Sequence, residues 1–484
     1  MKILIVASEA VPFAKTGGLA DVIGSLPQAL SRQGVEVRVV IPAYGAIDPL
    51  RFTLKPMIKD LPVPEGQGGM KRATVLTFQW RGVDFFFIGN DNYFSRPGLY
   101  QDEKGDYADN LERFAFFSRA TLEMLRYLKF QPEIIHAHDW QTALLSTYLK
   151  SLYRDDPFFA KVRTVFTIHN LGYQGLFPKE KFPLTGLSWD LFTPQGLEFY
   201  GQVNILKAGL ISSDLLTTVS PTYAREIQEG EAGFGLDGVL RERRDRLYGI
   251  LNGLDYEEWD PSRDKDVKQK FGLRTIEKRR ENRKDLQRIC GLPESEDFPI
   301  LGMVTRLADQ KGLDILAEAI PQMMRMNLQI VILGTGERKY HALLSKIARK
   351  YPRKIAVNLR YDPLFAKKIY AGCDIFLMPS RYEPCGLGQL IALRYGAIPL
   401  VHSTGGLSDT IRDFEAGTGE GNGFSFQNYS SEGLLSAFKK ALSIYHQKET
   451  WGKLIANALN CDFSWEASAR EYTHLYNMLL GKQL

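Results

Sequence analysis

Cysteine is scarce in this chain, and its scarcity excludes two classes of protein. The 484 residues include only Cys290, Cys373, Cys385 and Cys461. None of these stands in the C-x-x-C spacing typical of a structural zinc site. Four scattered cysteines also do not make the disulfide framework of a small secreted protein. We therefore expect a cytoplasmic protein that has neither feature.

Long apolar runs and an excess of one charge are missing as well. No stretch approaches the roughly 18 apolar residues of a membrane helix, and Glu9 interrupts the first apolar run, which indicates a buried strand and not a signal peptide. The net charge is only +5. Acidic residues interrupt the basic cluster at 278–284, so we predict a solvated helix face there. We expect no membrane partner and no nucleic-acid partner.

The chain does contain a repeated alternation of short apolar runs with helical patterns, typical of a parallel sheet. Its length is too great for one core. We predict an α/β fold with two Rossmann-like domains, 1–248 and 249–460, facing across a cleft where ligands bind. Residues 461–484 are expected to form a helix that packs back on the first domain. The expected strands are 3–7, 35–41, 85–88, 134–136, 164–168 and 215–219, then 300–304, 330–333, 355–359, 375–378 and 398–401.

A glycine turn with a cation follows the first expected strand. It reads Lys15-Thr16-Gly17-Gly18-Leu19. Paired glycines let backbone N–H groups approach an anion, and a helix beginning near Leu19 would point its positive end at the same place. The turn therefore predicts a phosphate site. An ordinary strand-to-helix turn with a solvated lysine fits the same five residues equally well.

Two cations follow the first strand of the second series. Arg306 and Lys311 lie five residues apart where the strand 300–304 gives way to a helix. Arginine binds a diphosphate bidentately and lysine adds a point charge. Positive charge at a helix start opposes the helix dipole and needs an anion nearby. We therefore favour a diphosphate site over a surface pair.

A glutamate and a glycine-rich turn follow the strand 375–378. In Glu383-Pro384-Cys385-Gly386-Leu387 the carboxylate can accept hydrogen bonds from sugar hydroxyls, and the backbone amides can donate to phosphate. The alternative is that Glu383 only caps the next helix. The small-residue turn at 403–407 is also consistent with phosphate or ribose contact.

Three histidines lie at strand ends of the first series. His136 and His138 share a strand face but have no third metal ligand, so we reject a metal site and expect core histidines with backbone partners. His169 begins a glycine-containing loop at 170–175. Because such loops carry binding and catalytic groups, His169 is the better site candidate.

In this order and at these separations, the motifs resemble those of the bacterial glycogen synthase and plant starch synthase family. The resemblance runs nearly from end to end. It implies a GT-B enzyme that transfers glucose from ADP-glucose to the non-reducing end of an α-1,4-glucan with retention of configuration, without a metal or other cofactor. The similar blocks are 15–22, 136–140, 167–170, 252–255, 306–312 and 383–387.

The resemblance also assigns roles to the residues that bind the donor. Arg306 and Lys311 would neutralise the departing diphosphate, and Glu383 would accept hydrogen bonds from glucose hydroxyls. His169 would orient the transferred glucose. The resemblance also places Lys15 among the catalytic residues, together with Arg306, Lys311, Glu383 and His169. The other donor contacts would be Gly17 and Gly18 at the distal phosphate or sugar, Asn252, Tyr361 against the adenine, and the amides of Cys385, Gly386 and Leu387.

The resemblance assigns less specific roles to three further residues. Asp21, Tyr100 and Asp139 are expected to position sugar or acceptor. The wider superfamily often has a second glutamate eight positions after the first, to bind ribose, but this chain has Ile391 there. No carboxylate can be placed as a nucleophile under the sugar, so we expect departure and attack on the same face and not a double displacement.

Two other classes share parts of this pattern. A glucan phosphorylase or sugar-nucleotide epimerase would use the same two-domain cleft, although a phosphorylase would carry a pyridoxal phosphate lysine. A non-catalytic glucan-binding protein would not need Arg306 and Lys311. The choice of ADP-glucose over UDP-glucose follows from the resemblance alone.

Overall fold

The computed structural model describes residues 1–482, the side chain of Gln67 excepted, and contains two compact units. Unit 1 comprises Met1–Gly253 and Trp465–Leu484, and unit 2 comprises Leu254–Ser464. The division falls at Gly253 and not at residue 248. Gly253 lies so close to Trp465 that an added Cβ would be 2.6 Å from its Cα atom. A glycine is therefore required where these two segments of unit 1 meet.

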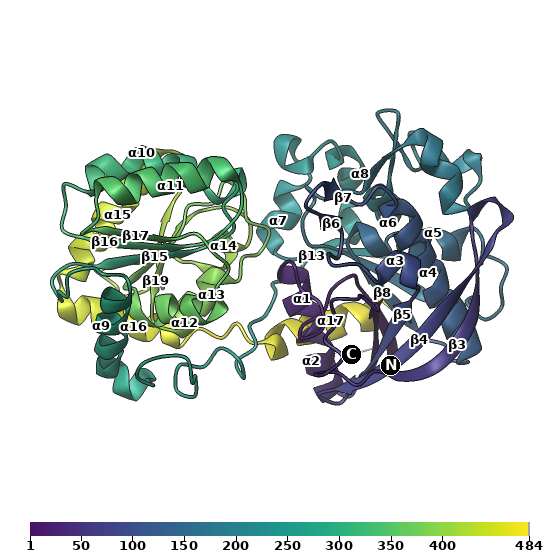
Figure 1. Ribbon diagram of the computed structural model, residues 1–484, viewed down its shortest axis with the longest axis horizontal. Coiled ribbons are helices and arrows are strands. Elements are labelled where there is room, and N and C mark those ends of the chain that lie inside the picture. The colour runs from purple at the N-terminus through teal and green to yellow at the C-terminus, as the bar shows by residue number, and fades with distance from the viewer. Residues whose placement is uncertain (483–484) are drawn as a thin grey trace. The chain divides into compact units, whose positions relative to one another are not determined.

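Unit 1 is built on a nine-stranded sheet in the order β14-β13-β9-β8-β1-β2-β5-β4-β3 (Figure 1). The six strands expected from the sequence are present, and all of them run parallel to their neighbours in that series. The strands are β1 (Lys2–Val6), β2 (Glu36–Pro42), β3 (Lys55–Pro64), β4 (Met70–Trp80), β5 (Val83–Gly89), β8 (Ile134–His138), β9 (Arg163–Ile168), β13 (Leu215–Thr218) and β14 (Leu247–Gly249).

The antiparallel strands β3 and β4 were not expected from the sequence. They extend the sheet beyond β5, and β4 is joined to β5 by a two-residue turn at Arg81 and Gly82. Both turn residues have positive φ, 47° and 81°. Positive φ at both positions is the conformation of a hairpin turn whose twist matches the strands.

Helices cover the sheet of unit 1. The described ones are α1 (Gly18–Ile23), α2 (Leu26–Arg32), α3 (Asp91–Phe94), α4 (Asn110–Tyr127), α5 (Leu144–Lys150), α6 (Ile205–Ser212), α7 (Pro221–Glu226), α8 (Asp237–Glu242) and α17 (Trp465–Leu479). Short 3-10 helices are η1 (Gly66–Gly68), η2 (Trp140–Thr142), η3 (Lys179–Thr185), η4 (Trp189–Leu191), η5 (Gly230–Gly233) and η6 (Arg244–Arg246). Two small antiparallel sheets pair β6 (Gln101–Asp102) with β7 (Gly105–Asp106), and β12 (Gln202–Asn204) with β10 (Leu176–Pro178) and β11 (Glu198–Phe199).

The C-terminal helix α17 belongs to unit 1, although unit 2 precedes it in the chain. It lies beside α2, where the yellow and purple ribbons meet in Figure 1. Arg32 of α2 bonds Glu466 of α17 at 2.5 Å, and the rings of Tyr472 and Tyr476 are fully buried. The aromatic residues at helical spacing therefore anchor α17 on unit 1. Residues 483–484 lie outside the described part.

Unit 2 contains a six-stranded parallel sheet in the order β17-β16-β15-β18-β19-β20. Five of the strands were expected. The strands are β15 (Ile300–Val304), β16 (Gln329–Leu333), β17 (Ile355–Asn358), β18 (Ile375–Met378), β19 (Ile398–His402) and β20 (Phe424–Phe426). The helices are α9 (Arg279–Ile289), α10 (Leu313–Met323), α11 (Arg338–Lys350), α12 (Pro363–Gly372), α13 (Gly388–Arg394), α14 (Gly405–Thr410), α15 (Ser431–Tyr445) and α16 (Lys448–Leu459), with 3-10 turns η7 (Leu273–Lys278) and η8 (Asp309–Lys311).

Helices cover both faces of this second sheet, with α10 and α11 on one side and α9, α12 and α13 on the other (Figure 1). Successive residues of β16 accordingly belong to different cores. Ile330 and Ile332 lie in one apolar cluster, and Val331 and Leu333 lie in the other. A strand buried on both faces is a continuous apolar run, which is why β16 was recognisable in the sequence.

The basic cluster at 278–284 is only partly a solvated helix face: Lys278 and Arg280 are exposed, as expected, but the expectation was wrong for Arg279 and Arg283. Arg279 and Arg283 on α9 are only 7% and 6% exposed. Arg283 donates to the buried carboxylate of Asp374, and Arg279 donates to the backbone oxygens of Tyr395 and Cys373. The two guanidinium groups therefore fasten α9 to the loops around β18. A buried arginine needs such partners because an unpaired buried charge is costly.

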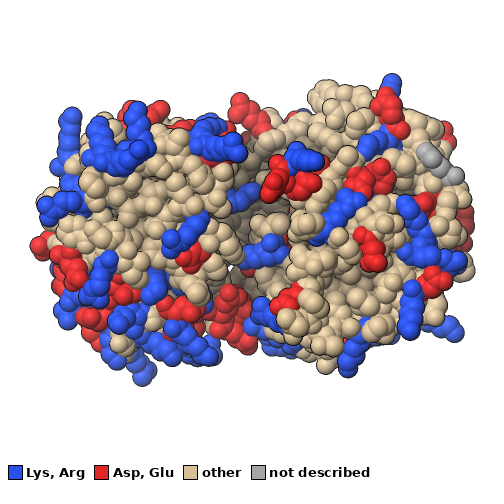
Figure 2. Space-filling view, viewed as in Figure 1, with Lys and Arg blue, Asp and Glu red and all other residues tan. Residues whose placement is uncertain are grey.

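Elsewhere on the surface the charges are mixed. Figure 2 shows basic and acidic side chains interspersed on the visible face of each unit, in agreement with the net charge of +5. In the part of the chain that the structure describes, no helix combines the length and the apolar character of a membrane span.

Candidate functional site

In unit 2, the predicted site residues follow neighbouring strands at one edge of the sheet. Arg306 comes two residues after β15, and Glu383 comes five residues after β18, which pairs with β15. Tyr361 follows β17. Parallel strands bring their carboxyl ends to the same edge, where ligands bind in open α/β sheets. The topology therefore collects the predicted donor-binding residues of unit 2 on one edge.

Lys311 and Glu383 form an ion pair. The Nζ atom of Lys311 donates to Oε2 of Glu383 at 2.6 Å, and the two side chains are only 14% and 10% exposed. Ser380 also donates its hydroxyl to the same oxygen at 2.9 Å. The sequence analysis assigned Lys311 to the diphosphate and Glu383 to the sugar. In the structure the two side chains are bonded to each other at the sheet edge.

This pair corrects two steps of the sequence argument. Glu383 does not cap α13, because that helix begins at Gly388 and its N-cap is Leu387. The anion needed near Lys311 is present within unit 2, because Glu383 itself supplies it. The positive charge before α10 therefore does not by itself require a phosphate.

The turn that carries Glu383 is held by Gln389, a residue that the sequence analysis did not single out. The buried side chain of Gln389 donates to the carbonyls of Cys385 and Gly386 at 2.9 and 3.1 Å. Gly386 has a φ of +77°, which favours glycine. These contacts fix the segment 383–387, which contains the predicted phosphate donors, the amides of Cys385, Gly386 and Leu387.

The glycine pair in the turn at 403–407 serves close packing. An added Cβ on Gly406 would lie 2.2 Å from the carbonyl oxygen of Cys385. The amide of Gly406 donates to the carbonyl of Glu383 at 3.1 Å. This amide is engaged inside the fold, so the expected phosphate or ribose contact is not supported at Gly406.

Three other positions of unit 2 bear on the prediction. Arg306 is exposed at the sheet edge. Tyr361 is 77% exposed, so its ring has an open face, as stacking would require. Ile391 is 6% exposed and packs in the apolar core on α13. The position at which the wider superfamily often has a ribose-binding glutamate is therefore part of the apolar core in this chain.

In unit 1, Lys15 and Asp21 form an ion pair at the start of α1, with 2.6 Å between Nζ and Oδ1. The helix begins at Gly18, as the sequence predicted. Gly17, however, donates its amide to the carboxylate of Glu9 at 3.0 Å. That amide is engaged by a protein anion, so its predicted role as an open phosphate donor is corrected.

Glu9 is the functional candidate that sequence reasoning missed. It is 4% exposed and follows β1. It accepts hydrogen bonds from the amide and hydroxyl of Thr16 at 2.5 Å each and from the Tyr100 hydroxyl at 2.7 Å. Burial and the Glu9 charge raise the pKa of Tyr100 well above its usual value, so its hydroxyl remains a donor. A lone acid at the end of an apolar strand was the available signal.

A chain of polar contacts connects α17 to His169. The hydroxyl of Tyr476 lies 2.7 Å from Nδ1 of His136, whose ring stacks on His138 with 4.1 Å between centroids. Nδ1 of His138 lies 3.0 Å from Nε2 of His169. The other nitrogen of His136 lies 2.6 Å from the Thr167 hydroxyl.

The expectation that His136 and His138 have backbone partners was therefore wrong, because their recorded partners are side chains. Burial lowers the pKa of His136 and of His169 to about 3, and it lowers that of His138 well below its usual value. These rings are neutral near pH 7. Within residues 1–482 no group of three His, Cys, Asp or Glu is arranged to hold a metal ion.

Asp139 has a strained backbone and a shifted pKa. Its φ is +57°, and its Oδ1 accepts the backbone N–H of His169 at 2.8 Å. Burial raises its pKa to about 7, with the Glu9 charge adding to the shift and the N–H donors opposing it. Non-glycine residues at positive φ gather at active sites. Glu9, Asp139 and His169 follow the adjacent strands β1, β8 and β9.

Asn252 lies at the end of unit 1, three residues after β14. It is 7% exposed, and its Oδ1 atom has no hydrogen-bond partner among the residues that the structure describes. A buried amide oxygen without a partner is costly. This oxygen is suited to a ligand hydroxyl or amine.

Known proteins match this arrangement over its whole length. The starch synthase catalytic domain family matches residues 2–242, and the glycosyl transferases group 1 family matches residues 290–458. The glycogen synthase of Desulforamulus reducens is 48% identical over 99% of both chains, and that of Geotalea daltonii is 47% identical over 100% of both.

Solved structures agree with these matches. The catalytic domain of starch synthase IV from Arabidopsis thaliana, bound to ADP and acarbose, has a TM-score of 0.92 with 33% identity over 99% of both chains. Sucrose-phosphate synthase from Thermosynechococcus elongatus has a TM-score of 0.61 with 17% identity over 99% of both chains, which shows the shared fold.

Fold and matches together define a glycosyltransferase of the GT-B class, with two Rossmann-like units. The resemblance inferred from the motifs is confirmed. The chain belongs to the glycogen synthase and starch synthase family.

Proposed function

We propose that this protein is a glycogen synthase that transfers glucose from ADP-glucose to the non-reducing end of an α-1,4-glucan with retention of configuration. Membership of the family supports the reaction class. The ADP and acarbose bound to the Arabidopsis relative support a nucleotide donor and a glucan-like ligand. The four free cysteines fit a cytoplasmic location.

The observation that carries the proposal is that two cations, Arg306 and Lys311, and the carboxylate of Glu383 follow the neighbouring strands β15 and β18 at one edge of the unit 2 sheet. A lysine ammonium has three donors, so Lys311 can hold Glu383 and a phosphate oxygen together. Arg306 adds a second cation at the same edge, and Glu383 keeps acceptor capacity for glucose hydroxyls. In this site the cations stabilise the charge that develops as ADP departs, which is the usual source of rate in such reactions.

In this proposal, residues of unit 1 position the donor and the acceptor. We assign His169 and Asn252 to the transferred glucose and donor, and Lys15 to the catalytic set. Asp21, Tyr100 and Asp139 are assigned to the acceptor or sugar. Glu9 joins them, because its hydrogen bonds to Thr16, Gly17 and Tyr100 fix the loop that carries Lys15. Groups that are held in position before the substrates bind reduce the entropy lost in reaching a reactive geometry.

The proposed course of reaction is departure and attack on one face of the sugar. The carboxylates of unit 1 that the structure places at strand ends, Glu9 and Asp139, both accept backbone N–H groups. In this proposal these carboxylates hold the backbone of their own loops in place, and they do not act as nucleophiles. The leaving phosphate itself guides the acceptor hydroxyl.

The test is incorporation of radiolabelled glucose into glycogen from ADP-glucose, with UDP-glucose as the parallel donor. We expect incorporation from ADP-glucose, an α-linked product and a visible spectrum without a pyridoxal band. If neither donor gives incorporation, the proposal is contradicted. A strong preference for UDP-glucose over ADP-glucose would overturn the donor assignment.

A further inference from the structure

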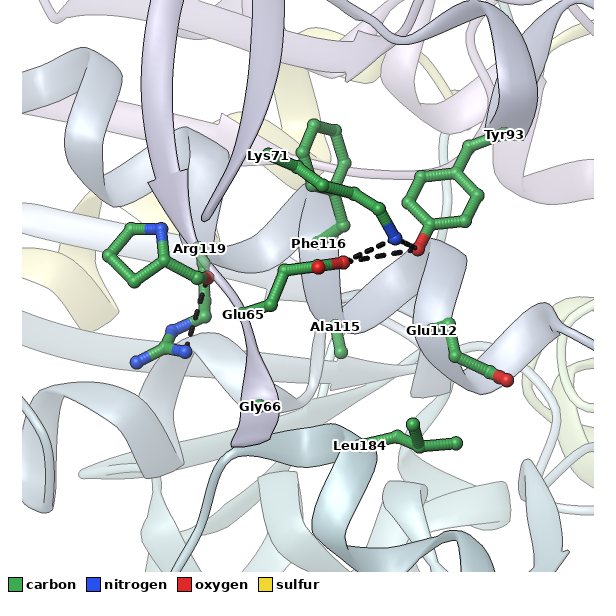
Figure 3. Close-up of a pocket in the computed structure, with 10 residues that line it drawn as sticks. Glu65, Gly66, Lys71, Tyr93, Glu112, Ala115, Phe116, Arg119 and Leu184 are labelled. Carbon is green, nitrogen blue, oxygen red and sulfur yellow. Dashed lines mark hydrogen bonds and ion pairs between the residues drawn. The ribbon is translucent and has the colours of Figure 1, made fainter. Parts of the chain in front are cut away.

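Unit 1 contains two clusters of polar side chains that differ in how completely they are paired. The first lines a cavity of about 150 Å³ beside α4 (Figure 3). Its two carboxylates each have a lysine partner, because Glu65 pairs with Lys71, as Figure 3 shows, and Glu112 pairs with Lys181. The second cluster consists of the histidines at the ends of β8 and β9. There the pairing is incomplete, and the unpaired atoms determine where the protons lie.

His138 has two ring nitrogens, and only one of them has a partner in the described part of the chain. Its Nδ1 lies 3.0 Å from Nε2 of His169. Its Nε2 is buried and has no hydrogen-bond partner among residues 1–482. The whole side chain is inaccessible to solvent, so water does not reach this nitrogen. The proton of a neutral His138 ring lies either on the paired nitrogen or on the unpaired one.

The cost of an unpaired donor decides between these two positions. Both rings are neutral at neutral pH, because burial lowers the pKa of His169 to about 3 and that of His138 well below its usual value. A neutral imidazole has one N–H donor and one bare acceptor nitrogen. A proton on Nε2 of His138 would bury an N–H without an acceptor, and such groups are rare in folded proteins. The proton of His138 therefore belongs on Nδ1, where it is donated to His169.

We propose that His138 fixes the tautomer of His169 and thereby determines what His169 offers to a ligand. Since Nε2 of His169 accepts the N–H of His138, the proton of His169 lies on its Nδ1. Among residues 1–482 this Nδ1 bonds no other group, and the side chain of His169 is partly exposed. The ring therefore presents an N–H donor to a ligand oxygen.

This role rests on the proposed function, in which His169 orients the transferred glucose. A sugar hydroxyl can accept the Nδ1–H of His169. The opposite tautomer would present a bare nitrogen, which can only accept. His138 is thus a positioning residue, because it acts through His169 and is itself buried away from any ligand.

The tautomers can be measured on the full chain with ¹⁵N-labelled histidine rings and without any substrate. In a neutral imidazole the protonated nitrogen and the bare nitrogen resonate at well separated ¹⁵N frequencies. The signals of His169 and His138 are assigned as those that disappear in His169→Asn and His138→Phe. We expect Nδ1 to be protonated and Nε2 to be bare in both rings. A proton on Nε2 of either ring would overturn the proposal.

Two substitutions of His138 separate the hydrogen bond from packing. His138→Phe fills the space of the ring without a donor, whereas His138→Asn leaves space unfilled but keeps an amide N–H. We expect His138→Phe to change the tautomer of His169 and to lower kcat with ADP-glucose about fivefold, the value of one hydrogen bond, with a smaller change in KM. His138→Asn should keep the tautomer and have the higher kcat of the two. A packing role predicts the reverse order, because the smaller side chain leaves a cavity.

His474→Phe is the matched control, because His474 is an exposed histidine on α17 of the same unit. It should change neither the His169 signals nor kcat. If His169 keeps its tautomer in His138→Phe, or if His138→Phe has a higher kcat than His138→Asn, the proposal is wrong. If the protein transfers no glucose at all, the proposed function fails, and the ring signals still decide the tautomer.

Discussion

At the scale of single residues, the central feature is that Lys311 and Glu383 act together. Their ion pair is largely buried, and Ser380 shares the same carboxylate oxygen. Removal of one member of such a pair leaves a buried charge without its partner. The two residues are therefore coupled in stability, and in the proposed reaction they are coupled in catalysis.

We predict that Lys311→Ala and Arg306→Ala each reduce turnover by about 100-fold or more while the fold survives. The reason is the loss of a cation that stabilises the departing diphosphate, an effect of about 10² to 10³ for one donor. Steady-state assays with ADP-glucose, and circular dichroism for the fold, check the outcome. Near-normal turnover in both variants would refute the phosphate role. The control is Lys339→Ala, because Lys339 pairs with Asp309 at the surface of the same unit and is 54% exposed.

Glu9 gives a second prediction at this scale. Glu9→Gln replaces an acceptor oxygen by a donor where the amides of Thr16 and Gly17 already donate. We expect the loop carrying Lys15 to lose its fixed position, with kcat reduced roughly tenfold or more, because misplaced groups lose the advantage of orientation. Glu36→Gln, an exposed carboxylate on β2, is the control. Equal kcat in the two variants would contradict the role of Glu9.

The sequence predicted some of these residues because their neighbours in sequence carry the signal. Glu383 and Arg306 follow apolar strands within a few residues, and parallel strands share one edge. The pairing of Lys311 with Glu383 was not predictable, because 72 residues separate them. The contact of Glu9 with Tyr100 was unpredictable for the same reason, since Tyr100 lies 91 residues further along the chain.

At the scale of elements, the parallel strands were predictable and the β3 and β4 hairpin was not. Strands buried on both faces, such as β1 and β16, are continuous apolar runs. In contrast, β3 and β4 are partly exposed and mix apolar with polar residues. The turn at Arg81 and Gly82 was the remaining signal, because glycine accommodates the positive φ that such a turn needs.

The helix α17 gives the prediction at this scale. Tyr476→Phe removes the hydroxyl that contacts His136 and leaves the ring in its packing. We expect a loss of about 1 kcal/mol in unfolding free energy, typical of one hydrogen bond, and a fall in kcat that exceeds any change in KM. The fall follows because the contact chain from His136 through His138 reaches His169.

Thr473→Val is the matched control, because Thr473 bonds Gln33 from the same helix without touching the histidines. It should lose less stability, because its hydrogen bond is exposed, and it should show no change in kcat. If both variants have the same kcat, the contact chain has no part in positioning His169.

At the scale of the whole molecule, the buried histidines contribute to the dependence of stability on pH. His136 has a pKa of about 3 in the folded protein and an ordinary value of 6.5. Below about pH 6.5 the unfolded chain binds a proton at this ring that the folded protein does not bind. The free energy of unfolding therefore falls as the pH drops from 6.5 toward 3, by about 1.4 kcal/mol per pH unit for one histidine.

We predict that His136→Gln removes the contribution of this histidine to the change of unfolding free energy with pH. Urea unfolding of both proteins at pH 5.5, 5.0 and 4.5 should give slopes that differ by about 1.4 kcal/mol per pH unit. Asp139, whose pKa is raised to about 7, contributes in the opposite direction, but it is present in both proteins and cancels in the difference. Identical slopes would show that His136 is not held neutral.

The central claim is that fixed cations and backbone amides at the carboxyl edge of the unit 2 sheet bind the diphosphate of the donor. A crystal structure of the full chain with ADP tests it most directly. We predict phosphate oxygens within hydrogen-bond distance of Arg306 and Lys311, with the turn at Gly386 beside them. ADP bound elsewhere, with these groups left uncontacted, would contradict the claim.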